Sequence, residues 1–166
     1  MIQMKDVSKI YTIGNEELYA LDKASLTIND GEFVAIIGQS GSGKSTLMNM
    51  LGLLDTPTSG EYYINGTLLD DLTDDQMSEI RNEEIGFIFQ GFNLIASLNA
   101  IENVELPLVY RGISKNERRE ISEAALKKVG LEKRMHHLPA ALSGGQQQRV
   151  AVARAIAAAP PVILAD

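Results

Sequence analysis

Uninterrupted apolar runs mark three segments of the chain: residues 31–38 (GEFVAIIG), 83–90 (EEIGFIFQ) and 161–166 (PVILAD). A parallel strand that is covered on both faces carries such a run, because both sets of alternating side chains point into apolar surroundings. The segments KASLTI (23–28) and GEYYING (60–66) instead alternate between flanking turn residues, as short strands do. The pattern therefore predicts a parallel core and an antiparallel β portion near the N-terminus.

Helical spacing fills most of the stretch between the second and third apolar runs. Ser114 with Glu117 three residues later has the spacing of a capping box, and Gly130 is expected to end that helix. A further helix is predicted from about Gly145 to Ala159, because the two prolines that follow cannot continue it. The whole pattern predicts an α/β fold whose core is interrupted by a helical insert at residues 91–159.

Composition narrows the classes of protein that fit this pattern. The 166 residues are 45% hydrophobic, and a chain of this length buries roughly 70% of its unfolded surface, which is enough for one core. The net charge is -7, whereas nucleic-acid binders usually carry an excess of basic residues that neutralise phosphates. Nucleic acid is therefore not expected as a main partner. Cysteine is absent, so the chain has no disulfides and no thiolate chemistry.

The hydropathy of the sequence also indicates whether the chain has a membrane-spanning segment. No apolar run approaches the roughly 20 residues that span a bilayer, and the N-terminus, MIQMKDVSKIY, has no signal pattern. Any membrane role is therefore expected to come through a partner.

The glycine-rich segment at residues 38–45, GQSGSGKS, matches the pattern G-x-x-x-x-G-K-[ST]. It follows an apolar run and opens a helical pattern, which is the strand, loop and helix order of a phosphate-binding unit. Glycines let backbone N–H groups turn inward around a β-phosphate, and the helix N-terminus completes the anion site. Lys44 is expected to reach the β- and γ-phosphate oxygens, and the Ser45 hydroxyl to ligate Mg²⁺. The segment therefore predicts nucleotide binding.

A second predicted helix start carries related chemistry. In ALSGGQQQR, Ser143 is a candidate N-cap, and Gly144 and Gly145 expose backbone N–H groups at the start of a helix. One nucleotide has one set of phosphates, which the first loop already holds. A second anion-binding end implies either a second ligand or a ligand shared with another chain.

With LSGGQ at residues 142–146, GQSGSGKST before it and VILAD after it, the whole chain resembles the ATP-binding subunits of ABC transporters. Further segments, among them EIGFIFQGFNLI and AIENVELPL, are most similar to the branch that serves macrolide export and lipoprotein release. The resemblance implies one P-loop NTPase domain, with a core at residues 1–90 and 160–166 and a helical subdomain at 91–159 that carries the signature. It also implies ATP and Mg²⁺ as cofactors and an ATP-dependent, head-to-tail homodimer. Membrane permease subunits would dock near Gln90 and hold this cytoplasmic chain at the inner face of the membrane.

The family pattern also assigns roles to individual residues. Tyr11 matches the aromatic residue that stacks on adenine, since a flat ring grips a purine without reading its edge. Ser143, Gly145 and Gln146 match the signature residues that reach the γ-phosphate of ATP held by the opposite subunit. The phosphate-binding loop consists of Gly38, Ser40, Gly41, Ser42, Gly43, Lys44, Ser45 and Thr46.

Two apolar runs end in polar residues that the family uses at the metal site. Gln90 matches the glutamine that contacts Mg²⁺ and the attacking water, and Asp166 matches the acid that holds Mg²⁺ through its water shell. The expected catalytic residues are Lys44, Gln90 and Asp166, and the expected metal site is Ser45, Gln90 and Asp166. In the family a water-polarising glutamate follows the aspartate, whereas this sequence stops there. We therefore expect a truncated chain with an incomplete core, which binds ATP but hydrolyses it slowly or not at all.

Other functions stay open at this point. A cell-division regulator uses the same ATPase cycle to signal to a membrane partner without transport. ATPases of DNA repair share the signature but insert long coiled coils before it, and this chain has no sustained heptads. Translation-factor relatives carry two such domains in one chain, and a non-catalytic nucleotide-binding fragment is the remaining interpretation.

Overall fold

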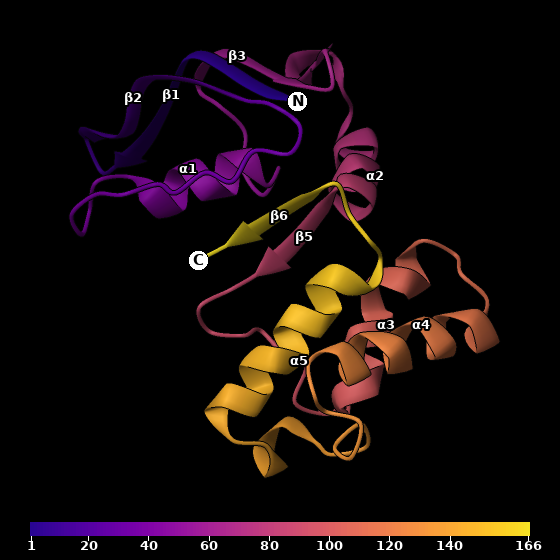
Figure 1. The fold of residues 1–166 in the computed structure, drawn as a ribbon. Coiled ribbons are helices and arrows are strands. Elements are labelled where there is room, and N and C mark those ends of the chain that lie inside the picture. The colour runs from indigo at the N-terminus through magenta and orange to yellow at the C-terminus, as the bar shows by residue number, and fades with distance from the viewer. The chain divides into compact units, whose positions relative to one another are not determined.

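The computed structural model describes residues 1–70 and 72–166, which form two compact units (Figure 1). Unit 1 is Met1–Ser78 and unit 2 is Glu79–Asp166. Each unit has its own sheet and its own buried residues. In the described part of the chain, every helix is too short or too polar to cross a membrane.

Unit 1 is built on an antiparallel sheet with the strand order β2-β1-β3-β4. The strand predicted at 23–28 is confirmed within β2, and the one predicted at 60–66 is confirmed as β3 up to Ile64, with a turn at residues 65–66, but β1 was not predicted. The register between β1 and β2 shifts at several points along their length, so the apolar residues of β1 do not alternate regularly. The elements of the unit are β1 (Ile2–Ile13), β2 (Glu16–Ile28), α1 (Lys44–Leu51), β3 (Ser59–Ile64), β4 (Thr67–Leu68) and η1 (Leu69–Asp71).

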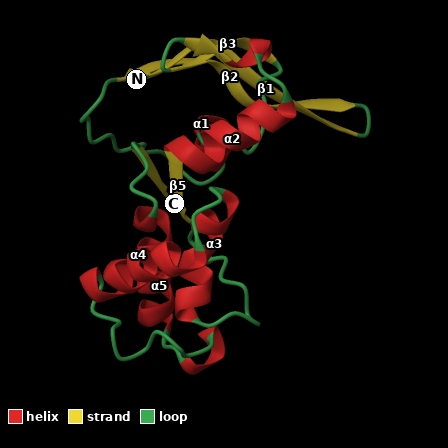
Figure 2. Cartoon of the chain, turned by 90° about the vertical axis from the view of Figure 1, so that its right-hand side faces the viewer, coloured by secondary structure: helices red, strands yellow, loops and turns green.

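The core of unit 1 joins the sheet to α1. Met4 and Tyr62 of the sheet, and Met50 and Leu51 of the helix, are almost completely buried. The Tyr62 hydroxyl donates to the carbonyl oxygen of Leu51 at 2.8 Å, so β3 is tied to the last turn of α1. Burial raises the pKa of Tyr62, which keeps this donor protonated. Figure 2 shows α1 beneath the four-stranded sheet.

The prediction of a buried parallel strand at residues 31–38 was wrong. These residues are not in a strand, and Phe33 and Ile37 are 98% and 92% exposed. A strand needs a neighbouring strand for its backbone N–H and C=O groups, and the ladders of both described sheets are formed by other segments. Apolar composition alone therefore did not place this segment in a core.

Unit 2 contains the parallel part of the fold. Strands β5 (Ile85–Ile88) and β6 (Val162–Ala165) pair in register from Ile85↔Val162 to Ile88↔Ala165, and they run side by side in Figure 1. Both fall within predicted apolar runs, so these two strands are confirmed. The helical elements are α2 (Asp74–Glu84), which crosses the boundary between the units in sequence, α3 (Ala100–Tyr110), α4 (Lys115–Lys128), η2 (Pro139–Ala141) and α5 (Gly144–Ala157).

Local signals explain where the helices of unit 2 begin. The hydroxyl of Ser114 accepts a hydrogen bond from the Glu117 backbone N–H at 3.4 Å at the start of α4, and α5 begins within one residue of the predicted start. Helix α3 was not predicted, although its start carries a complete capping box between Asn99 and Glu102. An Asn followed three residues later by Glu is the signal that could have located it.

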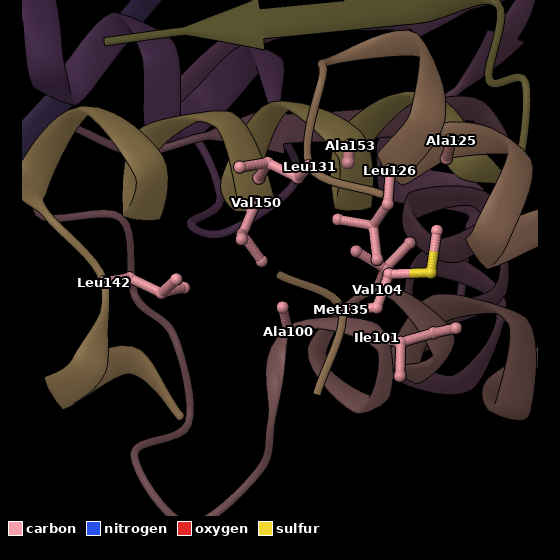
Figure 3. Packing of buried hydrophobic residues seen from close by; sticks show 10 residues of the cluster. All are labelled: Ala100, Ile101, Val104, Ala125, Leu126, Leu131, Met135, Leu142, Val150 and Ala153. Atoms are coloured by element: carbon pink, nitrogen blue, oxygen red, sulfur yellow. The ribbon is translucent and has the colours of Figure 1, made fainter. Parts of the chain in front are cut away.

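The three long helices of unit 2 enclose one apolar cluster. Ile101 and Val104 of α3, Leu126 of α4 and Val150 of α5 are completely buried (Figure 3). Asn103, also fully buried, bonds to the backbone of residues 95–99 through both ends of its amide, so the cluster also fixes the loop before α3.

One arginine holds two helix ends in unit 2. The Arg111 guanidinium donates to the carbonyl oxygens of Asn82 at 2.8 Å and Glu83 at 2.6 Å, near the end of α2. It also donates to the carbonyl oxygen of Ala158 at 2.7 Å, just after α5. The last carbonyls of a helix lack backbone partners and attract positive charge, so this contact satisfies two helix ends at once.

Candidate functional site

The glycine-rich loop of unit 1 leads directly into α1. Gly41 and Gly43 both have left-handed backbone angles, with φ of 80° and 84°, and Gly43 is the N-cap of the helix. A Cβ added to Gly43 would lie 2.4 Å from the carbonyl oxygen of Ala20 in β2, so a side chain has no room there. The first turn of a helix has backbone N–H groups without backbone partners, and this loop presents them as an anion-binding end.

The Lys44 side chain folds back over the loop that precedes it. Its ammonium donates to the carbonyl oxygens of Gly38 at 2.8 Å and Gln39 at 2.6 Å, and it lies 3.5 Å from the Ser42 hydroxyl oxygen. Ser45, the next residue, is exposed in the first turn of α1. The structure thus brings together a cation, a hydroxyl and a helix start on one short segment, as the sequence motif predicts.

Tyr11 lies near the end of β1 and is 37% exposed. Its hydroxyl donates to Oδ2 of Asp55 at 2.8 Å, and the Lys9 ammonium lies 5.2 Å from the centre of its ring. Lys9 also donates to Oδ1 of Asp55 at 2.5 Å. The aromatic side chain is therefore fixed at its hydroxyl and by a cation beside its ring.

These contacts shift the acidity of both Tyr11 and Asp55. The hydrogen bond to Asp55 raises the pKa of Tyr11. Burial raises the pKa of Asp55, but hydrogen bonds from Lys9, Tyr11 and the Thr56 backbone outweigh burial and leave that pKa below its ordinary value. Asp55 is consequently a carboxylate at neutral pH.

Gln90 and Asp166 follow the carboxyl ends of the two parallel strands of unit 2. The ladder continues to the Asp166 backbone N–H, which donates to the carbonyl oxygen of Ile88 at 3.0 Å. Both residues are exposed. The carboxyl ends of parallel strands are the usual ligand-binding edge of such sheets, and the structure brings these two predicted residues to that edge.

Ser143 and Gln146 form a complete capping box at the start of α5. The Ser143 hydroxyl accepts from the Gln146 backbone N–H at 3.3 Å, and the Gln146 side-chain oxygen accepts from the Ser143 backbone N–H at 2.9 Å. The N-cap role predicted for Ser143 is confirmed. Gly145 is exposed, and a Cβ added to it would meet nothing within 4 Å. The helix start is open to solvent.

The predicted site residues are divided between the two units. Tyr11 and the glycine-rich loop belong to unit 1, whereas Gln90, Asp166 and the signature residues belong to unit 2. Within unit 2, Ser143 begins α5 while Gly86 of β5 packs near the other end of that helix, against Ala155. The signature and the start of β5 therefore lie near different ends of α5.

The acidic and histidine side chains of the described residues are the candidates for metal ligation. In the residues that the structure describes, no group of three or more His, Cys, Asp or Glu side chains could hold a metal ion. The oxygens of Ser45, Gln90 and Asp166 are nevertheless of the hard type that Mg²⁺ prefers, and Mg²⁺ keeps several water ligands.

Sequence reasoning missed two residues of the site, Lys9 and Asp55. Lys9 lies two residues before Tyr11, so both point to the same face of β1, which was an available signal. Asp55 lies 44 residues beyond Tyr11 and gave no local signal.

Comparisons with known proteins agree with this geometry. A family model described as "ABC transporter" matches residues 21–166. Over its whole length the chain is 57% identical to a macrolide export ATP-binding/permease protein, MacB, of Hyphomonas neptunium, of which it covers 26%. It is 55% identical to an uncharacterized ABC transporter ATP-binding protein, MJ0796, of Methanocaldococcus jannaschii, of which it covers 72%. The chain thus spans about a quarter of the first relative.

A solved structure extends the likeness to three dimensions. The chain superimposes with a TM-score of 0.94, at 52% identity, on a dimeric, post-hydrolysis structure of the MJ0796 ATP-binding cassette bound to ADP and Pi. All of this chain and 73% of that one are covered. The predicted α/β fold, with an antiparallel portion and a helical insert, is that of the cassette.

Proposed function

The chain belongs to the ABC transporter family, and from this premise we propose that it is the ATP-binding subunit of an export or lipoprotein-release system. ATP binding and hydrolysis in this subunit drive movements of membrane partners. The observation that carries the proposal is the glycine-rich loop that leads into α1 with Lys44 folded over it. The name of the Hyphomonas neptunium relative, which joins macrolide export to ATP binding, supports the assignment to this branch.

Nucleotide binding in this proposal exchanges contacts that the loop already makes. The Lys44 ammonium is bonded to two carbonyl oxygens, and phosphate oxygens offer it stronger, charge-assisted partners. The other residues proposed to hold the phosphates are Gly38, Ser40, Gly41, Ser42, Gly43, Ser45 and Thr46. Tyr11 supplies the stacking surface for adenine, held in place by Asp55 and Lys9.

Hydrolysis involves the residues at the ends of β5 and β6. Ser45, Gln90 and Asp166 are the residues that would hold Mg²⁺, which neutralises charge on the transferring phosphoryl group when bound. Gln90 orients the attacking water, and Lys44 stabilises negative charge on the phosphates.

The signature residues act on a second copy of the chain. In a head-to-tail pair, Ser143, Gly145 and Gln146 of one copy contact the γ-phosphate held by the other. Their position at an exposed helix start supports this role, because a helix N-terminus favours negative charge. The dimeric structure of the MJ0796 cassette supports the pairing.

Membrane permease subunits are the further partners in this proposal. They dock near Gln90, and through them the chain is held at the cytoplasmic face of the membrane. The domain boundaries follow the same scheme, with a core at 1–90 and 160–166 and a helical subdomain at 91–159. A cell-division regulator that signals to a membrane partner without transport is the alternative, and the identity to MacB favours transport.

Replacing Lys44 tests the nucleotide-binding proposal directly. We expect Lys44→Ala to weaken ATP binding by roughly 100-fold or more, because charge-assisted bonds to phosphate are lost. Titration of the chain with a fluorescent ATP analogue, in Mg²⁺ buffer, measures this affinity. Lys133→Ala, which removes an exposed lysine of unit 2, is the matched control and should bind as the parent does. Equal affinity of the Lys44→Ala and parent chains would refute the assignment.

A further inference from the structure

Arg154 is a cation placed in the apolar part of α5. Its neighbours Ala153 and Ala155 are buried, and the arginine itself is half-buried. Burial lowers the pKa of Arg154, although a guanidinium remains charged in proteins. Among the described residues, no carboxylate lies within ion-pair distance of it. A half-buried cation without an anion needs another reason to be there.

The partners of Arg154 are two successive backbone carbonyls. Nη2 donates to the carbonyl oxygen of Phe92 at 2.8 Å, and Nη1 donates to that of Asn93 at 2.7 Å. Both bonds are short and come from the two terminal nitrogens of one planar group. A forked donor of this kind fixes the spacing and direction of the peptide units that it holds.

The segment that Arg154 holds has an unusual backbone. Phe92 and Asn93 both have left-handed angles, with φ of 60° and 47°, a conformation that residues with a Cβ seldom adopt, least of all twice in succession. Within the turn, the Phe92 N–H donates to the carbonyl oxygen of Phe89 and the Asn93 N–H donates to that of Gly91. Such a conformation persists when surrounding contacts fix it, and Arg154 supplies two of them.

The two residues that Arg154 holds, Phe92 and Asn93, lie two and three positions after Gln90. Helix α5 is itself packed tightly on β5, because a Cβ on Gly86 would come within 2.5 Å of the Ala155 carbonyl oxygen. The strand that leads to Gln90 and the turn that follows Gln90 are therefore both attached to adjacent residues of α5, Ala155 and Arg154.

We propose that Arg154 is a positioning residue, which fixes the turn at residues 91–93 and thereby sets the place of Gln90 beside Asp166. The role of Gln90 in this inference rests on the proposed ATPase function, whereas the contact between Arg154 and the turn does not. Arg154 touches no reacting group; it acts through the backbone that follows Gln90. It also joins that backbone to the helix whose first residues carry the signature, so a shift of α5 reaches the turn directly.

Amide hydrogen exchange without nucleotide tests the contact in the 166-residue chain. We expect Arg154→Gln to speed exchange at residues 91–94 by about tenfold or more, since two hydrogen bonds that close the turn are lost. Protection in α3, α4 and the rest of α5 should stay within about twofold of the parent. Arg149→Gln, an exposed arginine of the same helix, is the control and should leave the turn unchanged. Unchanged exchange in the turn, or an equal increase throughout unit 2, would overturn the proposal.

Two further variants separate a positioning role from simple packing. Adding Asn93→Gly to Arg154→Gln should slow exchange in the turn again, because glycine adopts the left-handed angle without a steric cost. Arg154→Lys keeps the charge but lacks the forked pair of donors, so its exchange rate in the turn should lie between those of the parent and Arg154→Gln. If Arg154→Gln does not fold, Arg154→Lys provides the test in its place. If the double variant exchanged its turn amides as fast as Arg154→Gln alone, the left-handed turn conformation would not be what Arg154 supports.

The consequence for catalysis is measured in the full-length protein with its membrane partner. Arg154→Gln should lower kcat for ATP hydrolysis by roughly 10- to 100-fold while ATP affinity changes by less than about twofold, because only the reacting geometry is displaced. An unchanged kcat with a loosened turn would refute the positioning role. If the parent bound no nucleotide, the proposed function would fail, while the exchange result would still decide the contact of Arg154.

Discussion

Lys9, Tyr11 and Asp55 form a cluster in which each residue restrains the other two. Lys9 lies beside the Tyr11 ring and bonds to one carboxylate oxygen of Asp55, while the Tyr11 hydroxyl bonds to the other. A residue proposed to stack on a base loses less conformational freedom on binding when its ring is already fixed. At the scale of single residues, Asp55 is therefore the support of the candidate adenine site.

Replacing Asp55 should show this support through its dependence on pH. The pKa of Asp55 is below its ordinary value of 3.8, so its stabilising contribution is fully present above that value and is lost as pH falls through the lowered pKa. We expect Asp55→Asn to lower the free energy of unfolding by about 1 kcal/mol at pH 7, with the difference shrinking below about pH 4. Urea unfolding at several pH values measures this, with Asp22→Asn, an exposed carboxylate, as the control. A difference independent of pH would contradict the ionic role.

Local motifs predicted some of these residues and could not predict others. The loop from Gly38 to Thr46 was found because its chemistry lies in consecutive residues, and Ser143 because a cap is set within four residues. Asp55 and Arg154 act through partners more than 40 positions away in sequence. No spacing rule connects such residues before the chain is folded.

Helix α5 lies very close to the backbone of β5 in unit 2. Gly86 faces the Ala155 carbonyl oxygen and the Pro160 ring, so the helix rests directly on the strand backbone. This spacing depends on the absence of a side chain at one position. At the scale of elements, Gly86 determines how deeply α5 sits on the parallel strands.

Gly86→Ala is therefore expected to be costly. The new methyl group would lie 2.5 Å from a backbone oxygen and 2.9 Å from Pro160, so α5 would have to move outward, at a cost of about 1–3 kcal/mol. Thermal or urea unfolding measures the loss. Gly144→Ala, where an added Cβ meets nothing within 4 Å, is the matched control and should be neutral or slightly stabilising. Equal stability of the two variants would show that the contact is looser than described.

The elements that sequence patterns located best are those whose partners are nearby or whose ends are capped. Strands β5 and β6 and helices α4 and α5 were predicted, whereas residues 31–38 carried the same apolar signal as β5 without forming a strand. The difference is the ladder, since β5 has a parallel partner and residues 31–38 are outside both described sheets. A pairing partner cannot be read from the composition of one segment.

At the scale of the whole molecule, the candidate residues form two sets on two units. Unit 1 carries the phosphate loop, and unit 2 carries the signature at the exposed start of α5. One copy therefore offers two separate anion-binding ends, and the pairing of copies proposed above uses both. The net charge of -7 opposes association, so we expect pairing to require the additional contacts that a nucleotide held between two copies supplies.

Ser143→Arg should separate nucleotide binding from pairing. The larger side chain at the exposed cap would obstruct a second copy, while the phosphate loop is unchanged, so we expect ATP affinity within about twofold of the parent and no ATP-dependent dimer. Size-exclusion chromatography with and without Mg-ATP measures the pairing. Ser114→Arg removes the comparable cap of α4 and should dimerise normally. An ATP-dependent dimer of Ser143→Arg would argue against the head-to-tail arrangement.

Arg111 is hydrogen-bonded to the backbone that precedes each of the two parallel strands. It holds the carbonyls of Asn82 and Glu83 just before β5, and that of Ala158 shortly before β6. A strand that slipped by one residue would advance its far end by about 3.3 Å and turn its side chains to the other face. A single side chain before the strands thus supports the register that carries Gln90 and Asp166 to the same edge of the sheet, although it lies outside the site.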